Sequence, residues 1–186
     1  MRKRVRRLVS GARFEHVERV AELARRIALA NAFSEAEVEA VVLAAILHDA
    51  ARELSDVELT ELAPPASEIE VSHPLSLHGR ASRVLAERWG VRRADVLEAI
   101  EGHVFGVPLT NRVGMALYVA DISEPGRGVN HDLRELALTD LDAAYRKAVC
   151  IKVDYLRECG KQVHPHTLAA YKAIHEALSE AANDAP

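Results

Sequence analysis

The stretch from Glu39 to Leu47, EAVVLAAIL, contains almost nothing that needs water, and it ends directly at His48 and Asp49. It is preceded by Ser34 and Glu37, which have the spacing of a helix-opening capping box. The pattern predicts a helix that opens at Ser34 and continues to about Arg52. Such a helix carries an imidazole and a carboxylate, in its last turn, into or beside the interior of the protein.

Asp49 needs a positive partner at this position, because burying an unpaired carboxylate costs on the order of several kcal/mol even after relaxation. Three partners are compatible with the sequence: Arg52, the N-terminus of another helix, or a metal ion. A cation is favoured there in any case, because the last carbonyls of a helix carry the negative end of its dipole.

Helical patterns also cover most of the remaining chain, and the fold class they predict is all-α. Aromatic residues make up only 4% of the chain, and the abundant Ala, Leu, Val, Arg and Glu favour helices over strands. Ser55 and Glu58 form a second capping-box pattern, residues 63–72 read as a loop, and Thr110 is the expected cap of an apolar helix. Helices are predicted at about 13–32, 34–52, 55–63, 74–89, 93–104, 110–122, 131–138, 140–159 and 165–182.

Length and charge limit the classes of protein to consider. A chain of 186 residues is expected to form a single domain, 1–186, with C-terminal helices at about 131–183. The net charge of −4 provides no general basic field, so no nucleic-acid partner is expected, and the basic start MRKRVRR is interpreted as a solvated helical turn. Nucleic-acid contact by this basic start is the alternative.

The expected location is the cytoplasm. The N-terminal residues lack the apolar region of a secretory signal, and no window is long enough for a membrane span, so no membrane partner is expected. Cys150 and Cys159 fall on one predicted helix, about 13 Å apart, which is too far for a disulfide.

Several polar residues share one property, which is that each lies within or beside an apolar helical stripe. They are His16, His48, Asp49, His78, His103 and Asp121. A metal pair would satisfy them together, and a mixed N/O ligand set suits iron, manganese, zinc or cobalt. Asp49 would bridge the two ions, as in two-metal hydrolases. Taken singly, each histidine could instead be a hydrogen-bonded core residue, and Asp121 could simply pair with Arg127.

In chain order, these residues resemble the HD-domain metal-dependent phosphohydrolases, all-helical proteins with a helix histidine, an HD pair and a distant aspartate. The segments LHG at 77–79, AIEGHVFG at 99–106, VADISEPGR at 119–127 and HPHTLAAY at 164–171 are similar to the YqeK-like subgroup. The resemblance implies a dinuclear centre, usually of iron, and symmetrical cleavage of diadenosine tetraphosphate to two ADP. Arg52 and Val104 stand where the subgroup has a lysine and a threonine.

Roles for single residues follow from this resemblance as hypotheses. Asp49 would be the catalytic residue that bridges the metals activating a water molecule. Arg52 and Arg127 would hold the flanking phosphates, with surface ion pairs as the alternative, and Glu124 would orient Arg127 or a ligand hydroxyl. Helix-cap or surface roles suffice for the histidines outside the pattern: His73, His131, His164, His166 and His175.

Two other functions remain open. The chain could be an HD-type phosphohydrolase acting on another nucleotide, or a nucleotide-binding sensor that keeps the helical scaffold without turnover. A homodimer is possible.

Overall fold

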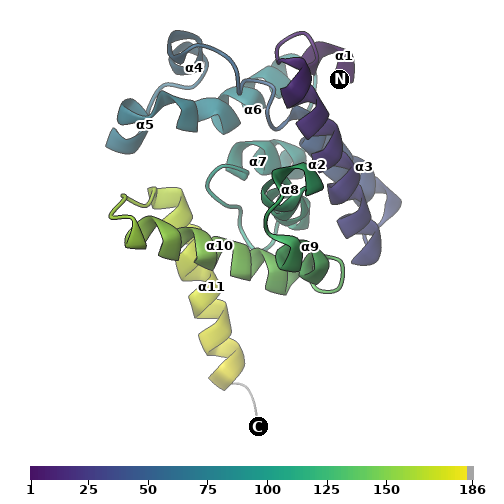
Figure 1. The fold of residues 1–186 in the computed structure, drawn as a ribbon, viewed down its shortest axis with the longest axis vertical. Coiled ribbons are helices and arrows are strands. Elements are labelled where there is room, and N and C mark those ends of the chain that lie inside the picture. Colours follow the sequence, from purple (N-terminus) through teal and green to yellow (C-terminus); the bar gives the residue numbers. More distant parts are fainter. Residues whose placement is uncertain (184–186) are drawn as a thin grey trace.

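The computed structural model describes residues 1–183, and the regular elements of that part of the chain are all helices, which confirms the all-α prediction (Figure 1). Residues 184–186, the end of the expected single domain, lie outside the described part. The α-helices are α1 Arg2–Val5, α2 Gly11–Ala30, α3 Glu35–Leu47, α4 Asp56–Leu62, α5 Glu68–Ser72, α6 His78–Arg88, α7 Ala94–Gly102, α8 Arg112–Ser123, α9 His131–Ala137, α10 Leu141–Glu158 and α11 Pro165–Asn183. Two short 3₁₀ helices, η1 Pro74–Leu77 and η2 Pro125–Arg127, connect them.

Helix α3 opens as predicted but ends earlier. Ser34 and Glu37 form the capping box, whereas the helix stops at Leu47 and not near Arg52. The His48 ring lies 2.7 Å from the Ala45 carbonyl, the group that would accept the Asp49 N–H if the helix continued. The chain turns through shorter i to i+3 bonds instead, such as Arg52 N–H to Asp49 O at 3.0 Å. His48 and Asp49 therefore follow the helix and are not in its last turn.

Three other boundaries also differ from the predictions. The expected loop at 63–72 contains α5, because the Ser67 hydroxyl caps it at the Glu70 N–H. Pro74 opens a 3₁₀ turn before α6 begins. Asn111, and not Thr110, caps α8, with its side-chain oxygen 2.8 Å from the Gly114 nitrogen. These errors concern a short helix and the exact ends of two others, which local patterns decide poorly.

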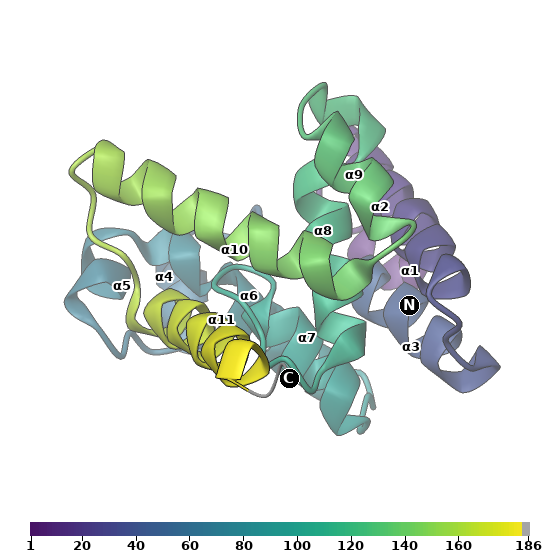
Figure 2. The same cartoon turned by 90° about the horizontal axis from the view of Figure 1, so that it is seen from below.

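Helix α8 occupies the centre of the fold. Nearly all of its side chains are buried, and it contacts α2, α3, α7, α9 and α10 (Figures 1 and 2). The main hydrophobic core includes Val5 of α1 and Ile174 of α11. A smaller cluster around Leu59 and Leu77 lies beneath α4 and η1. The polar residues on α2, α3, α6, α7 and α8 are therefore presented around one central helix.

Two further features agree with the sequence. Cys150 and Cys159 are both free, and the basic residues Arg2, Lys3 and Arg4 are exposed on the short α1. In residues 1–183, no helix combines the length and the apolar character needed to cross a membrane.

Candidate metal centre

The polar residues singled out in the sequence come together from five helices. His16 lies on α2, His48 and Asp49 follow α3, and His78 begins α6, whereas His103 follows α7 and Asp121 lies in the last turn of α8. Their ligand atoms form three overlapping groups that could each hold a metal ion: His16, His48 and Asp49; His48, His103 and Asp121; and Asp49, His78 and His103. The structure thus places all six side chains in one cluster.

Asp49 lies between two pairs of histidines. Its Oδ2 atom is 3.8 Å from His16 Nε2 and 3.5 Å from His48 Nε2. Its Oδ1 atom is 3.4 Å from His78 Nε2 and 3.6 Å from His103 Nε2. Asp121 joins the first pair, with Oδ1 3.1 Å from His16 Nε2. Each oxygen of Asp49 therefore faces a different half of the cluster, as a bridging carboxylate would.

The other ring nitrogen of each histidine is already used. The Nδ1 atoms of His48, His78 and His103 each lie 2.7 Å from a backbone carbonyl three residues earlier. His16 Nδ1 lies 3.1 Å from Glu124 Oε1. Since carbonyl and carboxylate oxygens only accept, each Nδ1 carries a proton, and Nε2 is the nitrogen left to bind a metal ion. All four rings present this nitrogen to the cluster.

Glu124 fixes His16 and is itself held from two sides. Arg19 Nε donates to Glu124 Oε2 at 2.7 Å, and the Gly126 N–H donates to the same oxygen at 2.6 Å. Burial raises the Glu124 pKa, but the bonds from Arg19 and His16 outweigh burial and lower it to about 2. A side chain at Gly126 would clash with Arg19, because its Cβ would lie 2.5 Å from Arg19 Nε. Glu124 was expected to orient Arg127 or a ligand hydroxyl; the Arg127 side chain bonds Asp121 instead, and the second role stays a prediction.

Gly79 allows His78 to reach His103. A Cβ at Gly79 would lie 2.6 Å from the Glu101 carbonyl oxygen, so α6 can approach the backbone of α7 this closely only without a side chain there. The close approach brings His78 Nε2 to 3.0 Å from His103 Nε2. The HG pair in the sequence is thus a candidate ligand followed by the residue that makes its position possible.

Arginines contact both aspartates of the cluster. Arg13 Nη1 lies 3.1 Å from Asp49 Oδ2, and Arg127 Nη2 lies 2.5 Å from Asp121 Oδ1. The ion pair between Asp121 and Arg127, which the sequence offered as the alternative to a metal site, is therefore present, but Asp121 also contacts His16. The sequence reasoning missed Arg13 as well as Arg19. Arg13 and Arg19 each lie three residues from His16, so all three side chains share one face of α2. This spacing was the sequence signal that could have identified the two arginines.

Arg52 does not supply the counter-charge of Asp49. It is half-buried in the turn after Asp49, and its side chain makes no hydrogen bond or ion pair with the side chains of residues 1–179 or with the described backbone. Arg13 takes this place instead. The role of Arg52 toward phosphate stays a prediction.

The two aspartates favour positive charge on the neighbouring imidazoles. Burial opposes the charge on His48, but Asp49 and Asp121 outweigh burial and raise the His48 pKa to about 9. Burial also acts on Asp49, but His48, His103 and His78 bring its pKa well below the usual range. The Asp121 pKa is likewise lowered, because His16 and His48 outweigh burial. A field that draws a proton onto a buried imidazole also attracts metal cations.

The donor set fits a pair of transition-metal ions. The Nε2 atoms of His16 and His48 are buried and have no hydrogen-bond partner in the described residues. The lone pairs of His78 and His103 would repel at 3.0 Å unless a proton or a metal ion lay between them. Imidazole nitrogens with carboxylate oxygens are the ligand types of iron, manganese, cobalt and zinc sites.

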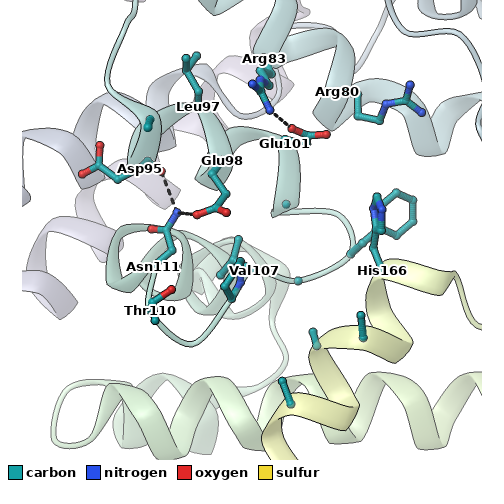
Figure 3. A pocket seen from close by; sticks show the side chains of 18 of the residues that line it. Arg80, Arg83, Asp95, Leu97, Glu98, Glu101, Val107, Thr110, Asn111 and His166 are labelled. Atoms are coloured by element: carbon teal, nitrogen blue, oxygen red, sulfur yellow. Dashed lines mark hydrogen bonds and ion pairs between the residues drawn. The ribbon is translucent and has the colours of Figure 1, made fainter.

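A large cavity lies elsewhere. It has a volume of about 910 Å³, lies between α6, α7 and α11, and is rimmed by Arg83, Glu101, Glu98 and His166 (Figure 3). None of the six cluster residues lines it, although Gly102 and Phe105 on either side of His103 do. The chemistry is therefore assigned to the cluster, where the unpartnered buried nitrogens are.

The fold and the cluster together define a protein that is all-helical over its described residues and carries a candidate metal centre. The chain belongs to the HD-domain family, whose model, described as HD domain, matches residues 13–143. It is also similar to the crystal structure of a protein from Clostridium acetobutylicum described as a predicted HD superfamily hydrolase involved in NAD metabolism. That similarity has a TM-score of 0.84 and 25% identity, and covers 95% of each chain.

Sequence relatives confirm the resemblance to the YqeK-like subgroup. The symmetrical bis(5'-nucleosyl)-tetraphosphatase of Bacillus subtilis is 30% identical over 164 residues, which cover 84% of this chain and 87% of that protein. The protein of the same name from Halalkalibacterium halodurans is 30% identical, with 87% and 88% covered. A probable nicotinate-nucleotide adenylyltransferase/Ap4A hydrolase of Mycoplasma genitalium is 29% identical over 74% of this chain. The match spans only 41% of that longer relative.

Proposed function

We propose that this protein hydrolyses dinucleoside polyphosphates, cleaving diadenosine tetraphosphate with one water molecule into two ADP. The main support is the convergence of four histidine Nε2 atoms on the two oxygens of Asp49. The names of the relatives from Bacillus subtilis and Halalkalibacterium halodurans support the substrate.

The proposed centre holds two transition-metal ions, iron first, with manganese, cobalt or zinc as substitutes. His16, His48, Asp49 and Asp121 would hold one ion, and Asp49, His78 and His103 the other. When bound, such ions supply Lewis-acid charge at phosphoryl oxygens and lower the pKa of a coordinated water toward neutrality. Asp49 is the catalytic residue in this proposal, because both halves of the centre depend on its position.

The protein's own residues would position the substrate. Arg127 uses Nε and Nη2 on Asp121, and its side chain is 38% exposed, so its remaining donors can reach a phosphate at the edge of the cluster. Arg52 is proposed for a second phosphate. Glu124 was expected at the substrate as well, but its buried bonds to His16 and Arg19 support a positioning role.

Product analysis tests this function. The protein loaded with Fe²⁺ or Mn²⁺ is incubated with diadenosine tetraphosphate, and the expected product is ADP alone. AMP with ATP would contradict symmetrical cleavage, and turnover of only dGTP or a nucleoside monophosphate would favour another HD-type phosphohydrolase. Two bound metals without turnover of any nucleotide would favour a sensor.

Matched variants complete this test. Asp49→Ala should abolish turnover, whereas Asp132→Ala, which removes an exposed carboxylate bonded to Lys147, should leave it unchanged. A cytoplasmic location and a homodimer stay predictions from sequence.

A further inference from the structure

Lys152 of α10 lies beside the metal centre although it is outside residues 13–143, which the HD family model matches. Its Nζ donates a hydrogen bond to the Val104 carbonyl and lies 5.9 Å from the ring centroid of Phe105 and 5.7 Å from that of Tyr118. Val104 and Phe105 directly follow the ligand His103, and Tyr118 lies one helical turn before the ligand Asp121. Helix α10 therefore brings a cation between two of the ligand-bearing segments.

The charge of Lys152 has no matching anion. Among the side chains of residues 1–179, Lys152 has no ion-pair partner, and the single Val104 carbonyl accepts only one of the three hydrogens of its ammonium group. Burial lowers the Lys152 pKa to about 8, and the field of Asp121 only partly opposes this. The Asp121 carboxylate already contacts His16 and Arg127. The lysine is thus a desolvated cation with spare donors.

A second observation at the same place concerns Tyr118. Its hydroxyl is buried and has no hydrogen-bond partner in the described residues. A buried polar group without a partner is costly, so an unsatisfied donor near an underpaired cation points to a ligand that supplies acceptors. The side chain of Val104 offers no hydrogen-bond acceptor.

We propose that Lys152 binds a phosphate group of the substrate next to the one that the metal centre holds. This inference rests on the proposed function and deepens it. A compact ammonium is suited to a phosphate oxygen, and aromatic ring faces on two sides keep it in place without neutralising it. Lys152 would then select for nucleotides with two or more linked phosphates over monophosphates, and it would do so from outside the part of the chain matched by the family model.

The test compares the binding of ADP and AMP to the manganese-loaded protein by isothermal titration calorimetry. Lys152→Met should weaken ADP binding by about tenfold or more and AMP binding by no more than about threefold. Lys152→Arg, which keeps the charge, should retain ADP binding to within about threefold. The matched control is Lys147→Met on the same helix, because Lys147 is exposed and paired with Asp132. It should leave both affinities unchanged.

Two results would overturn the inference: unchanged ADP affinity in Lys152→Met, or equal weakening of ADP and AMP. If Lys152→Met fails to fold, Lys152→Gln keeps a donor for the Val104 carbonyl and is measured in its place; unfolding of both variants would make the lysine structural and also overturn the inference. The comparison does not depend on turnover of diadenosine tetraphosphate. If the wild-type protein cleaves only another nucleotide while Lys152→Met shows the predicted loss of ADP affinity, the proposed function alone is refuted.

Discussion

His16 Nδ1 lies 3.1 Å from Glu124 Oε1, whereas the Nδ1 atoms of the other three histidines of the cluster contact backbone carbonyls three residues earlier. The reason is position. His48 and His103 follow the ends of helices and His78 follows a 3₁₀ turn, where a carbonyl three residues earlier is within reach. His16 lies inside α2, whose carbonyls are engaged in helix hydrogen bonds. Its orientation therefore depends on a carboxylate 108 residues away in the chain.

Replacing Glu124 by Ala should weaken one metal ion selectively. His16 would lose the acceptor that fixes its ring, and loss of such a partner typically reduces metal affinity by about 10- to 100-fold. Metal analysis after dialysis should show a fall from about two equivalents to about one. Glu135→Ala, an exposed carboxylate near His131, is the control. Retention of both ions at the original affinity would contradict a positioning role.

The two halves of the centre should respond differently to single substitutions. Asp49→Ala removes the ligand common to both halves, so both ions should be lost, whereas His78→Ala should remove mainly the ion shared with His103. Titration of the metal-free variants with Mn²⁺ measures the stoichiometry. Loss of a single ion in Asp49→Ala would show that Asp49 does not bridge.

Gly79→Ala should disturb the contact between α6 and α7. The new methyl group would lie 2.6 Å from the Glu101 carbonyl oxygen, so the helices must separate, at a cost of about 1–3 kcal/mol in the free energy of unfolding. Urea unfolding of the metal-free protein measures this. Gly11→Ala is the matched control, because nothing lies within 4 Å of a Cβ there, and it should be neutral or slightly stabilising. Equal effects of the two substitutions would argue against the close approach.

The metal-free protein should lose stability as the pH rises above neutrality. The folded-state pKa of His48, about 9, lies above the ordinary value of 6.5, so the folded state binds the proton more tightly than the unfolded state. This contribution is complete below pH 6.5 and is lost as the pH approaches 9. Between pH 6.5 and 8, the loss should be about 1–2 kcal/mol.

Urea unfolding at these two pH values checks the prediction. His48→Gln should lack this part of the pH dependence, while His131→Gln, an exposed histidine, should retain it. Indistinguishable pH profiles for wild type and His48→Gln would refute the assignment to His48.

Much of the architecture could be predicted because its signals are local. The capping boxes at Ser34 and Ser55 involve residues only three apart, and both occur in the structure. The end of α3 was predicted too late, because the His48 ring bonds the Ala45 carbonyl that an extended helix would use. His164 was expected at a cap or on the surface, but its ring is buried and stacks on Phe105 with 3.7 Å between centroids. That contact requires the segment just before α11 to reach the turn after α7.

The sequence by itself determined most of the helices and the six polar residues placed on or beside their apolar faces, because helical period and capping depend on neighbours in the chain. Only the tertiary structure decided which oxygen of Asp49 faces which histidines, that Arg13 meets Asp49, and that Glu124 serves His16. It also decided that α10 brings Lys152 to Val104. These relations depend on how whole helices are placed around α8, and that placement comes from the packing of the shared core, which no local pattern specifies.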